Sequence, residues 1–200
     1  MATFDAIYGL STAIKTLLED NYPSNWGTLL ISIVQPTAIS SGIDTSKEGF
    51  TVSLYRVSVS GTQKSQNSRR DGNGKLYCPS HLVDLHYLIT PWAKTPEKQH
   101  QMLGWLITLI GDQGKMSSAL LNRNLADPKT FGQLESVQLG FESLPWTDHF
   151  NLWDKLRTNF PASATCVARM VALDSLRPID EPEAVHTRKY VAVQIQTEEA

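Results

Sequence analysis

The sequence predicts an α+β fold, with a mixed, mostly antiparallel β-sheet flanked by two or three helices. Strand-like segments outnumber helical ones, and the helices interrupt the run of strands without the strict alternation of a parallel α/β fold. One segment, residues 82–90, is almost continuously apolar, as expected for a central strand that is covered on both faces. Of the 200 residues, 41% are hydrophobic and 19% are charged, which is enough apolar material for the core of one domain.

The chain is expected to open with a helix over residues 4–21. Its apolar residues recur at helical spacing, Thr3 is the expected N-cap, and Pro23 ends the helix. A β-rich run over residues 29–35 predicts the first strand.

The clearest strand is predicted over residues 50–60. Its apolar positions change parity near Tyr55 and Arg56, which indicates either a β-bulge or a strand that is buried on both faces. The polar segment 61–74 that follows is expected to be a mobile loop between two strands.

The second half of the chain carries one strong helix start. Pro91 is expected to end the central strand, and Thr95-Pro96-Glu97 then combines an N-cap, a proline at the first helical position and an early acid, so a helix is predicted to about residue 111. The remaining expected elements are a short helix at 117–121, a strand at 138–144, a helix at 147–157, a strand at 163–173, a linker at 177–183 and a last strand at 188–196.

Composition limits the function classes. The net charge of −2 argues against a nucleic-acid partner, and the absence of an 18-residue apolar run argues against membrane insertion. The start shows no targeting signal, and two cysteines fit synthesis in a reducing compartment, so folding in the cytoplasm is expected.

Catalytic signatures are weak, and no catalytic, cofactor or metal residue is assigned. Cys78, His81, His86 and His100 are the only ligand types that cluster, and a Cys-x-x-His pair can begin a zinc site. No second pair has matching spacing, so we expect His86 to be a buried histidine that is satisfied by hydrogen bonds. No Gly-x-Ser-x-Gly motif supports a serine nucleophile.

The helix after Pro96 has more apolar surface than one sheet can cover. One stripe, expected to pack on the sheet, contains Leu103, Leu106, Ile107 and Ile110, and a second contains Met102, Trp105 and Leu109. The second stripe packs either against another part of this chain or in a seam between subunits.

Two other segments are candidate subunit contacts. Arg69 and Arg70 lie in a basic loop, which is either solvated or bound to a partner. The last predicted strand either folds back as a hairpin or adds to the sheet edge of a neighbour. Its candidate interface residues are Tyr190, Val191, Val193 and Ile195.

Two segments resemble a known family. Residues 82–93 (LVDLHYLITPWA) and 100–112 (HQMLGWLITLIGD) resemble the central block of the cap, or tail-terminator, proteins of bacterial contractile injection systems, such as the antifeeding prophage and the Photorhabdus virulence cassettes. The resemblance extends weakly over most of residues 4–174, with Trp92 where tyrosine is commoner.

The resemblance implies a phage tail-terminator-like domain over residues 1–176, with a linker and C-terminal tail over 177–200. It implies a non-enzymatic structural protein that forms a hexameric ring ending the inner tube, the sheath or both. Its partners would be other copies of itself, tube and sheath proteins and paralogous caps, in a particle that assembles in the bacterial cytoplasm and is released or membrane-anchored. The alternatives are another tail or baseplate adaptor ring, or a small metal-binding enzyme that uses Cys78, His81 and His86.

Overall fold

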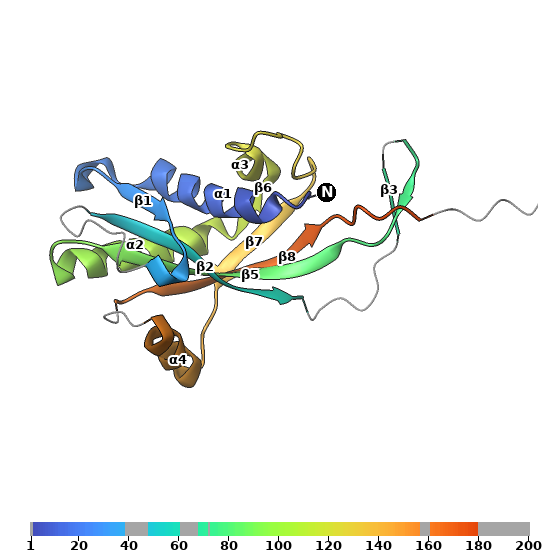
Figure 1. The fold of residues 1–200 in the computed structure, drawn as a ribbon. Coiled ribbons are helices and arrows are strands. Elements are labelled where there is room, and N and C mark those ends of the chain that lie inside the picture. The colour runs from blue at the N-terminus through green and yellow to red at the C-terminus, as the bar shows by residue number, and fades with distance from the viewer. Residues whose placement is uncertain (1, 39–47, 61–67, 72, 157–160, 180–200) are drawn as a thin grey trace, which may run out of the picture.

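The computed structural model describes residues 2–38, 48–60, 68–71, 73–156 and 161–179 (Figure 1). One six-stranded sheet carries helices on both faces. The helices are α1 (Ala6–Asn21), α2 (Pro96–Gln113), α3 (Ser118–Asn122) and α4 (Trp146–Leu156), with short 3₁₀ helices η1 (Ser24–Trp26) and η2 (Pro36–Ala38). The strands are β1 (Leu30–Ile33), β2 (Gly49–Val59), β3 (Arg69–Arg70), β4 (Leu76–Tyr77), β5 (His81–Trp92), β6 (Lys115–Ser117), β7 (Ser136–Phe141) and β8 (Ala164–Leu173).

The strand order in the main sheet is β1-β2-β5-β8-β7-β6. All neighbouring pairs are antiparallel except β1–β2, which is parallel, so the predicted mixed, mostly antiparallel α+β fold is confirmed. The close approach of β1 and β2 requires Gly49, because a Cβ there would lie 1.9 Å from the Leu30 carbonyl oxygen. Three short strands were not predicted. β6 lies at one edge of the sheet, and β3, which falls within the expected loop 61–74, pairs with β4 in a separate hairpin.

The main core lies between the sheet and helices α1 and α2 (Figure 1). Leu10, Ile14 and Leu18 of α1 are buried at helical spacing, as the amphipathic pattern predicts. Tyr87 of β5 is fully buried among them, and its hydroxyl lies 3.0 Å from the Ser11 Oγ. This hydrogen bond satisfies the one polar atom that the tyrosine brings into the core.

The predicted β-bulge in β2 is confirmed. Leu54 pairs with Tyr87 and Arg56 pairs with His86, so Tyr55 is the extra residue. A second bulge lies in β8, where Met170 adopts a φ of +57°. The Asp84 carboxylate accepts a 2.8 Å hydrogen bond from the Met170 backbone N–H and holds that conformation.

Two expected element ends differ from the structure. Pro91 was expected to end β5, but the strand continues to Trp92. β8 pairs with β5 only as far as Ile89, so one side of β5 has no partner strand at Pro91. A proline, which has no N–H to donate, is tolerated at such a position. Thr95 caps α2 as predicted, accepting a hydrogen bond from the Lys98 N–H. Thr3 is not the N-cap of α1: Asp5 holds that position, and Thr3 only forms the turn before it.

The opposite face of the sheet carries α4 and a small second core (Figure 1). Leu88 of β5 is fully buried at its centre. Val34, Tyr55, Trp92 and Leu152 pack around it. One face is therefore covered by long helices, and the other is covered only where α4 lies.

Candidate assembly interface

Helix α2 has one buried stripe instead of the two expected. Met102, Leu106 and Ile110 are its buried residues and follow one another at a spacing of four. The Met102 side chain is 0% exposed within a single chain, which favours the alternative that it packs inside this chain. Ile107, expected to face the sheet, is instead 48% exposed.

Trp105 is covered mainly by this chain's own aromatic residues. Its ring centroid lies 5.7 Å from those of Tyr22 and Phe50 and 6.2 Å from that of Trp26. Leu109 packs against the same core. These contacts favour the intrachain alternative, whereas a contact of Trp105 or Leu109 with another subunit stays a prediction.

Charged side chains close the rim of this aromatic cluster. The Lys98 Nζ lies 3.8 Å from the centroid of the Trp26 ring and 4.0 Å from the Glu48 carboxylate. Burial, followed by the charge of Glu48, raises the pKa of Tyr22. The cluster is therefore a stabilising corner of the fold and offers little open apolar surface.

Arg69 and Arg70 lie on a hairpin that stands away from the body of the sheet (Figure 1). β3 and β4 form this hairpin, and the Asp71 carboxylate tightens its turn by accepting hydrogen bonds from the N–H groups of Asn73 and Lys75. Residues 177–179 lie against the other side of β4, with one hydrogen bond at each end of that contact. We call β3, β4 and residues 177–179 the basic arm, because residues 69–78 and 177–179 contain four basic residues and one acidic residue.

Helix α4 presents aromatic side chains to solvent. Trp146 and Phe150, one turn apart, are 70% and 48% exposed, and their rings meet edge to face at 4.6 Å. Asp154 follows at the same spacing and is exposed. With about 100° per residue, these three side chains lie within about 80° of helix circumference, whereas Leu152 points about 160° away from the middle of the group, toward the sheet. We call Trp146, Phe150 and Asp154 the outer stripe of α4.

A cavity of about 340 Å³ lies between α4 and the bulged part of β2. Arg56 of β2 and Asp148 and Asn151 of α4 supply its polar lining. Tyr55 also lines this cavity. Its hydroxyl is buried and makes no hydrogen bond among the described residues. Burial, and next the charge of Glu142, raises the pKa of Tyr55 to about 12. The phenol therefore stays neutral at physiological pH.

A polar cluster that sequence reasoning missed links three strand segments on this face. The Ser58 Oγ lies 2.8 Å from the His86 Nε2, and the His86 Nδ1 lies 2.5 Å from the Glu142 Oε2. His86 is only 5% exposed, which agrees with the expected hydrogen-bonded, buried histidine. The one available signal was a histidine facing the same side as Asp84 in an otherwise apolar strand.

The order serine–histidine–glutamate is also that of a hydrolase triad. Such a triad needs N–H donors that converge where the oxyanion develops. Ser58 pairs with Asp84 within the antiparallel ladder, one residue before the end of β2, so the backbone N–H groups beside it lie in the plane of the sheet and its side chain stands perpendicular to them. The cluster is therefore built to tie β2, β5 and the end of β7 together.

The residues of the proposed zinc site do not come together. Cys78 lies at the base of the basic arm, His81 is exposed at the start of β5, and His100 is exposed on α2. Within the ranges that the structure describes, no three His, Cys, Asp or Glu side chains are grouped to hold a metal ion. Cys78, His81 and His86 are therefore not arranged as one metal site in the part of the chain that the structure describes.

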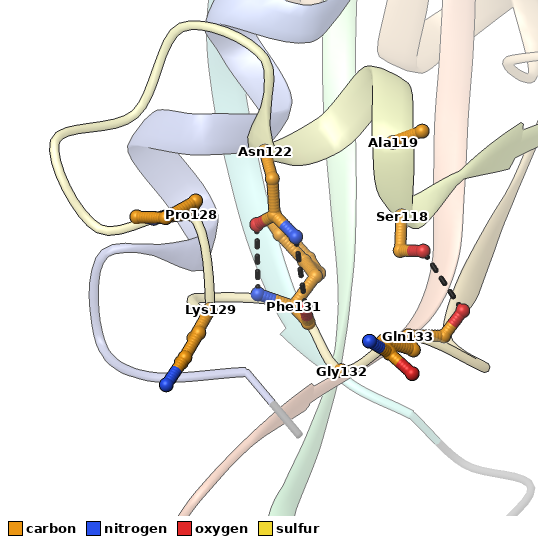
Figure 2. Close-up of a pocket in the computed structure, with 8 residues that line it drawn as sticks. All are labelled: Ser118, Ala119, Asn122, Pro128, Lys129, Phe131, Gly132 and Gln133. Atoms are coloured by element: carbon orange, nitrogen blue, oxygen red, sulfur yellow. Dashed lines mark hydrogen bonds between the residues drawn. The ribbon is translucent and has the colours of Figure 1, made fainter.

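A second cavity, of about 530 Å³, lies between α3 and the loop that leads to β7 (Figure 2). Its polar groups are used to hold the loop. The Asn122 side-chain amide bonds both backbone polar groups of Phe131, at 2.8 and 2.9 Å, and the Ser118 hydroxyl donates to the Gln133 carbonyl. Lys129 is the one ionisable residue in its lining, so this cavity has no acid–base pair.

Two expectations concern other parts of the chain. The predicted strand with Tyr190, Val191, Val193 and Ile195 lies outside the described residues. In the described part of the chain, no helix combines the length and the apolar character needed to cross a bilayer.

Comparison with known proteins gives one family and several similar solved structures. The family model "Pvc16 N-terminal domain" matches residues 9–187, and no curated protein matches the chain. One similar structure is the sheath/tube terminator, in its extended state, of the extracellular contractile injection system PVC. It is 14% identical with a TM-score of 0.63, and the alignment covers 100% of this chain and 67% of that one.

The second similar structure is the tube-terminating cap of the anti-feeding prophage. It is 17% identical with a TM-score of 0.54, and the alignment covers 90% of this chain and 60% of that one. At these identities the likeness shows a shared fold, and this chain spans about two thirds of the length of those proteins.

Proposed function

The chain belongs to the Pvc16 N-terminal domain family, and we propose that it is a structural cap that ends the tail of a contractile injection system. The observation that carries the proposal is the shared fold: the alignment with the PVC sheath/tube terminator extends over the whole chain. The described residues offer no equipped catalytic site, which supports a structural role over an enzymatic one.

The cap is proposed to act as a hexameric ring at the end of the inner tube, the sheath or both. A closed ring needs two different faces on each subunit, because each copy contacts its two neighbours head to tail. Arg69 and Arg70 on the basic arm are proposed to serve one of these faces. Tube and sheath proteins of the particle are the proposed partners of a third face, and paralogous caps are further candidates.

One open edge of the sheet suits the predicted strand of the tail. β1 is the last strand on its side of the described sheet. The N–H groups of Leu30 and Val34 donate to the carbonyls of Glu48, just before β2, and Val52. Those of Ile31 and Ile33 therefore point outward, because alternate residues of a strand face opposite neighbours. Residues 188–196 are proposed to add to an edge of this kind in a neighbouring protein, where main-chain hydrogen bonds supply affinity.

The test is to assemble particles with and without this chain and to image their non-baseplate ends by cryo-electron microscopy. We expect particles without the chain to have a broad distribution of tube and sheath lengths and no density beyond the last ring. Restoring the chain should restore one defined end with six-fold density. Normal ends and normal lengths without the chain would refute the cap function.

A truncation tests the tail separately. It should be placed after Ile179, because cutting after Leu176 would also remove the residues that pair with β4 of the basic arm. We expect the truncated protein to melt like the full chain and to cap fewer particles. A truncated protein that caps normally would refute strand donation, and a loss of folding would favour an intrachain hairpin.

A further inference from the structure

We propose that the basic arm of one copy docks on the outer stripe of α4 in the next copy of the ring. This inference rests on the proposed cap function, and it names the two faces that meet between subunits. Each face is exposed, and the two differ in chemistry as a head-to-tail contact requires.

The arm is positively charged in a negatively charged protein. Four basic residues and one acidic residue lie in residues 69–78 and 177–179, so the arm carries +3 and the rest of the chain, whose total is −2, carries −5. Arg70, Lys75 and Arg177 are exposed, and Leu176 at the root of the arm is 75% exposed. The arm therefore offers cations beside one large apolar side chain.

The outer stripe of α4 offers the complementary groups. Asp154 supplies a carboxylate near the end of the helix, and Trp146 supplies an exposed indole face on which a guanidinium or ammonium group can stack. Phe150 adds apolar surface for Leu176. Tryptophan and arginine are the residue types that most often dominate the energy of protein interfaces.

The position of the two faces favours contact between copies. The arm projects beyond one end of the sheet, whereas α4 lies under the other half of it, on the face away from α1 and α2 (Figure 1). Asp148 and Arg56 line the cavity between β2 and α4, on the side of the helix away from the outer stripe. The outer stripe is therefore left with one exposed carboxylate for a basic partner.

Charge reversal with rescue tests this contact. Lys75 is the better arm residue to change, because the Arg70 guanidinium also donates to the Gly74 carbonyl within the hairpin. Asp154 is the better stripe residue, because a cation near the C-terminus of α4 is compatible with the helix dipole. We expect Lys75→Glu and Asp154→Lys each to lower the fraction of capped particles about tenfold or more, since each places like charges together. The double variant should restore capping.

Matched controls reverse exposed charges elsewhere. Lys129→Glu and Asp112→Lys should leave capping unchanged, and thermal melts of every isolated variant should agree with the unmodified protein. Crosslinking gives an independent readout. A variant with Lys75→Cys and Asp154→Cys, in which Cys78→Ser removes the neighbouring thiol, is treated with a short bismaleimide in assembled particles. We expect covalent multimers of the chain. Lys75→Cys combined with Asp112→Cys should give none.

The outcomes separate this contact from the cap function. The contact is refuted, and the cap function stands, if three results are found together. Removing the chain abolishes the defined ends, both charge-reversal variants cap normally, and the cysteine pair gives no crosslink. An effect of Asp154→Lys without an effect of Lys75→Glu, and without rescue, would assign the stripe to another component and overturn the proposal. Normal ends without the chain would refute the cap function itself.

Discussion

Replacing Trp105 by alanine distinguishes an internal aromatic corner from a subunit seam. The side chain makes ring contacts with Tyr22, Trp26 and Phe50 at 5.7 to 6.2 Å. Each such contact contributes about 0.5–1.5 kcal/mol beyond area burial, and truncating a buried tryptophan costs about 3–5 kcal/mol. Because Trp105 is only partly buried, we expect a loss near the lower bound, about 3 kcal/mol, and a fall in Tm of about 6–12 °C.

The assay is thermal and urea denaturation of the isolated protein, with circular dichroism as the signal. The protein concentration is kept low, so that subunits do not associate. The matched control is Ile107→Ala, on the same helix and 48% exposed, which should change the free energy of unfolding by less than about 1 kcal/mol. If Trp105→Ala melts like the unmodified protein but no longer caps particles, the reasoning is refuted and the residue belongs to a subunit seam.

Three further changes test other contacts. Glu142→Ala removes the partner of His86 and should lower the free energy of unfolding by about 1–3 kcal/mol in urea titrations, and an unchanged midpoint would contradict the buried cluster. Burial raises the pKa of the Cys166 thiol to about 12, so a maleimide at pH 8 should react with the native protein only at Cys78. Mass spectrometry should then count one added maleimide in the native protein and two in denaturant, and two rapid additions to the native protein would contradict the burial of Cys166. Gly49→Ala should lower Tm and loosen β1, because the new Cβ meets a carbonyl oxygen at 1.9 Å, and hydrogen exchange as slow as in the unmodified protein would count against that geometry.

Features set by short stretches of chain were predictable from the sequence. The Thr95 cap and the start of α2 depend on three adjacent residues, and the bulge at Tyr55 appears as a change of parity within a single strand. The apolar run that became β5 also identified the centre of the sheet, because only a strand covered on both faces needs so little polarity.

Features that depend on distant residues were not predictable. Ile107 and Met102 exchange the expected roles, since periodicity gives a stripe but not the side on which the sheet lies. The hydrogen bonds of His86 join residues 28 and 56 positions away. The parallel pairing of β1 with β2 and the short edge strand β6 likewise follow from tertiary contacts, because a three- or four-residue run has too little pattern of its own.

The two bulges that flank β5 have a mechanical consequence. One extra residue in β2 and one in β8 lie opposite the same short part of β5, and bulges bend a strand and increase its twist. The bulges lie only three to six residues from the start of β5, about 10–20 Å along the strand, so a change of bend there alters the direction of the basic arm attached before that start. Deleting Tyr55 would thus change the direction in which the basic arm projects, while the residues of the arm stay the same. In a head-to-tail assembly, such an angular error turns a closed circle into an open spiral.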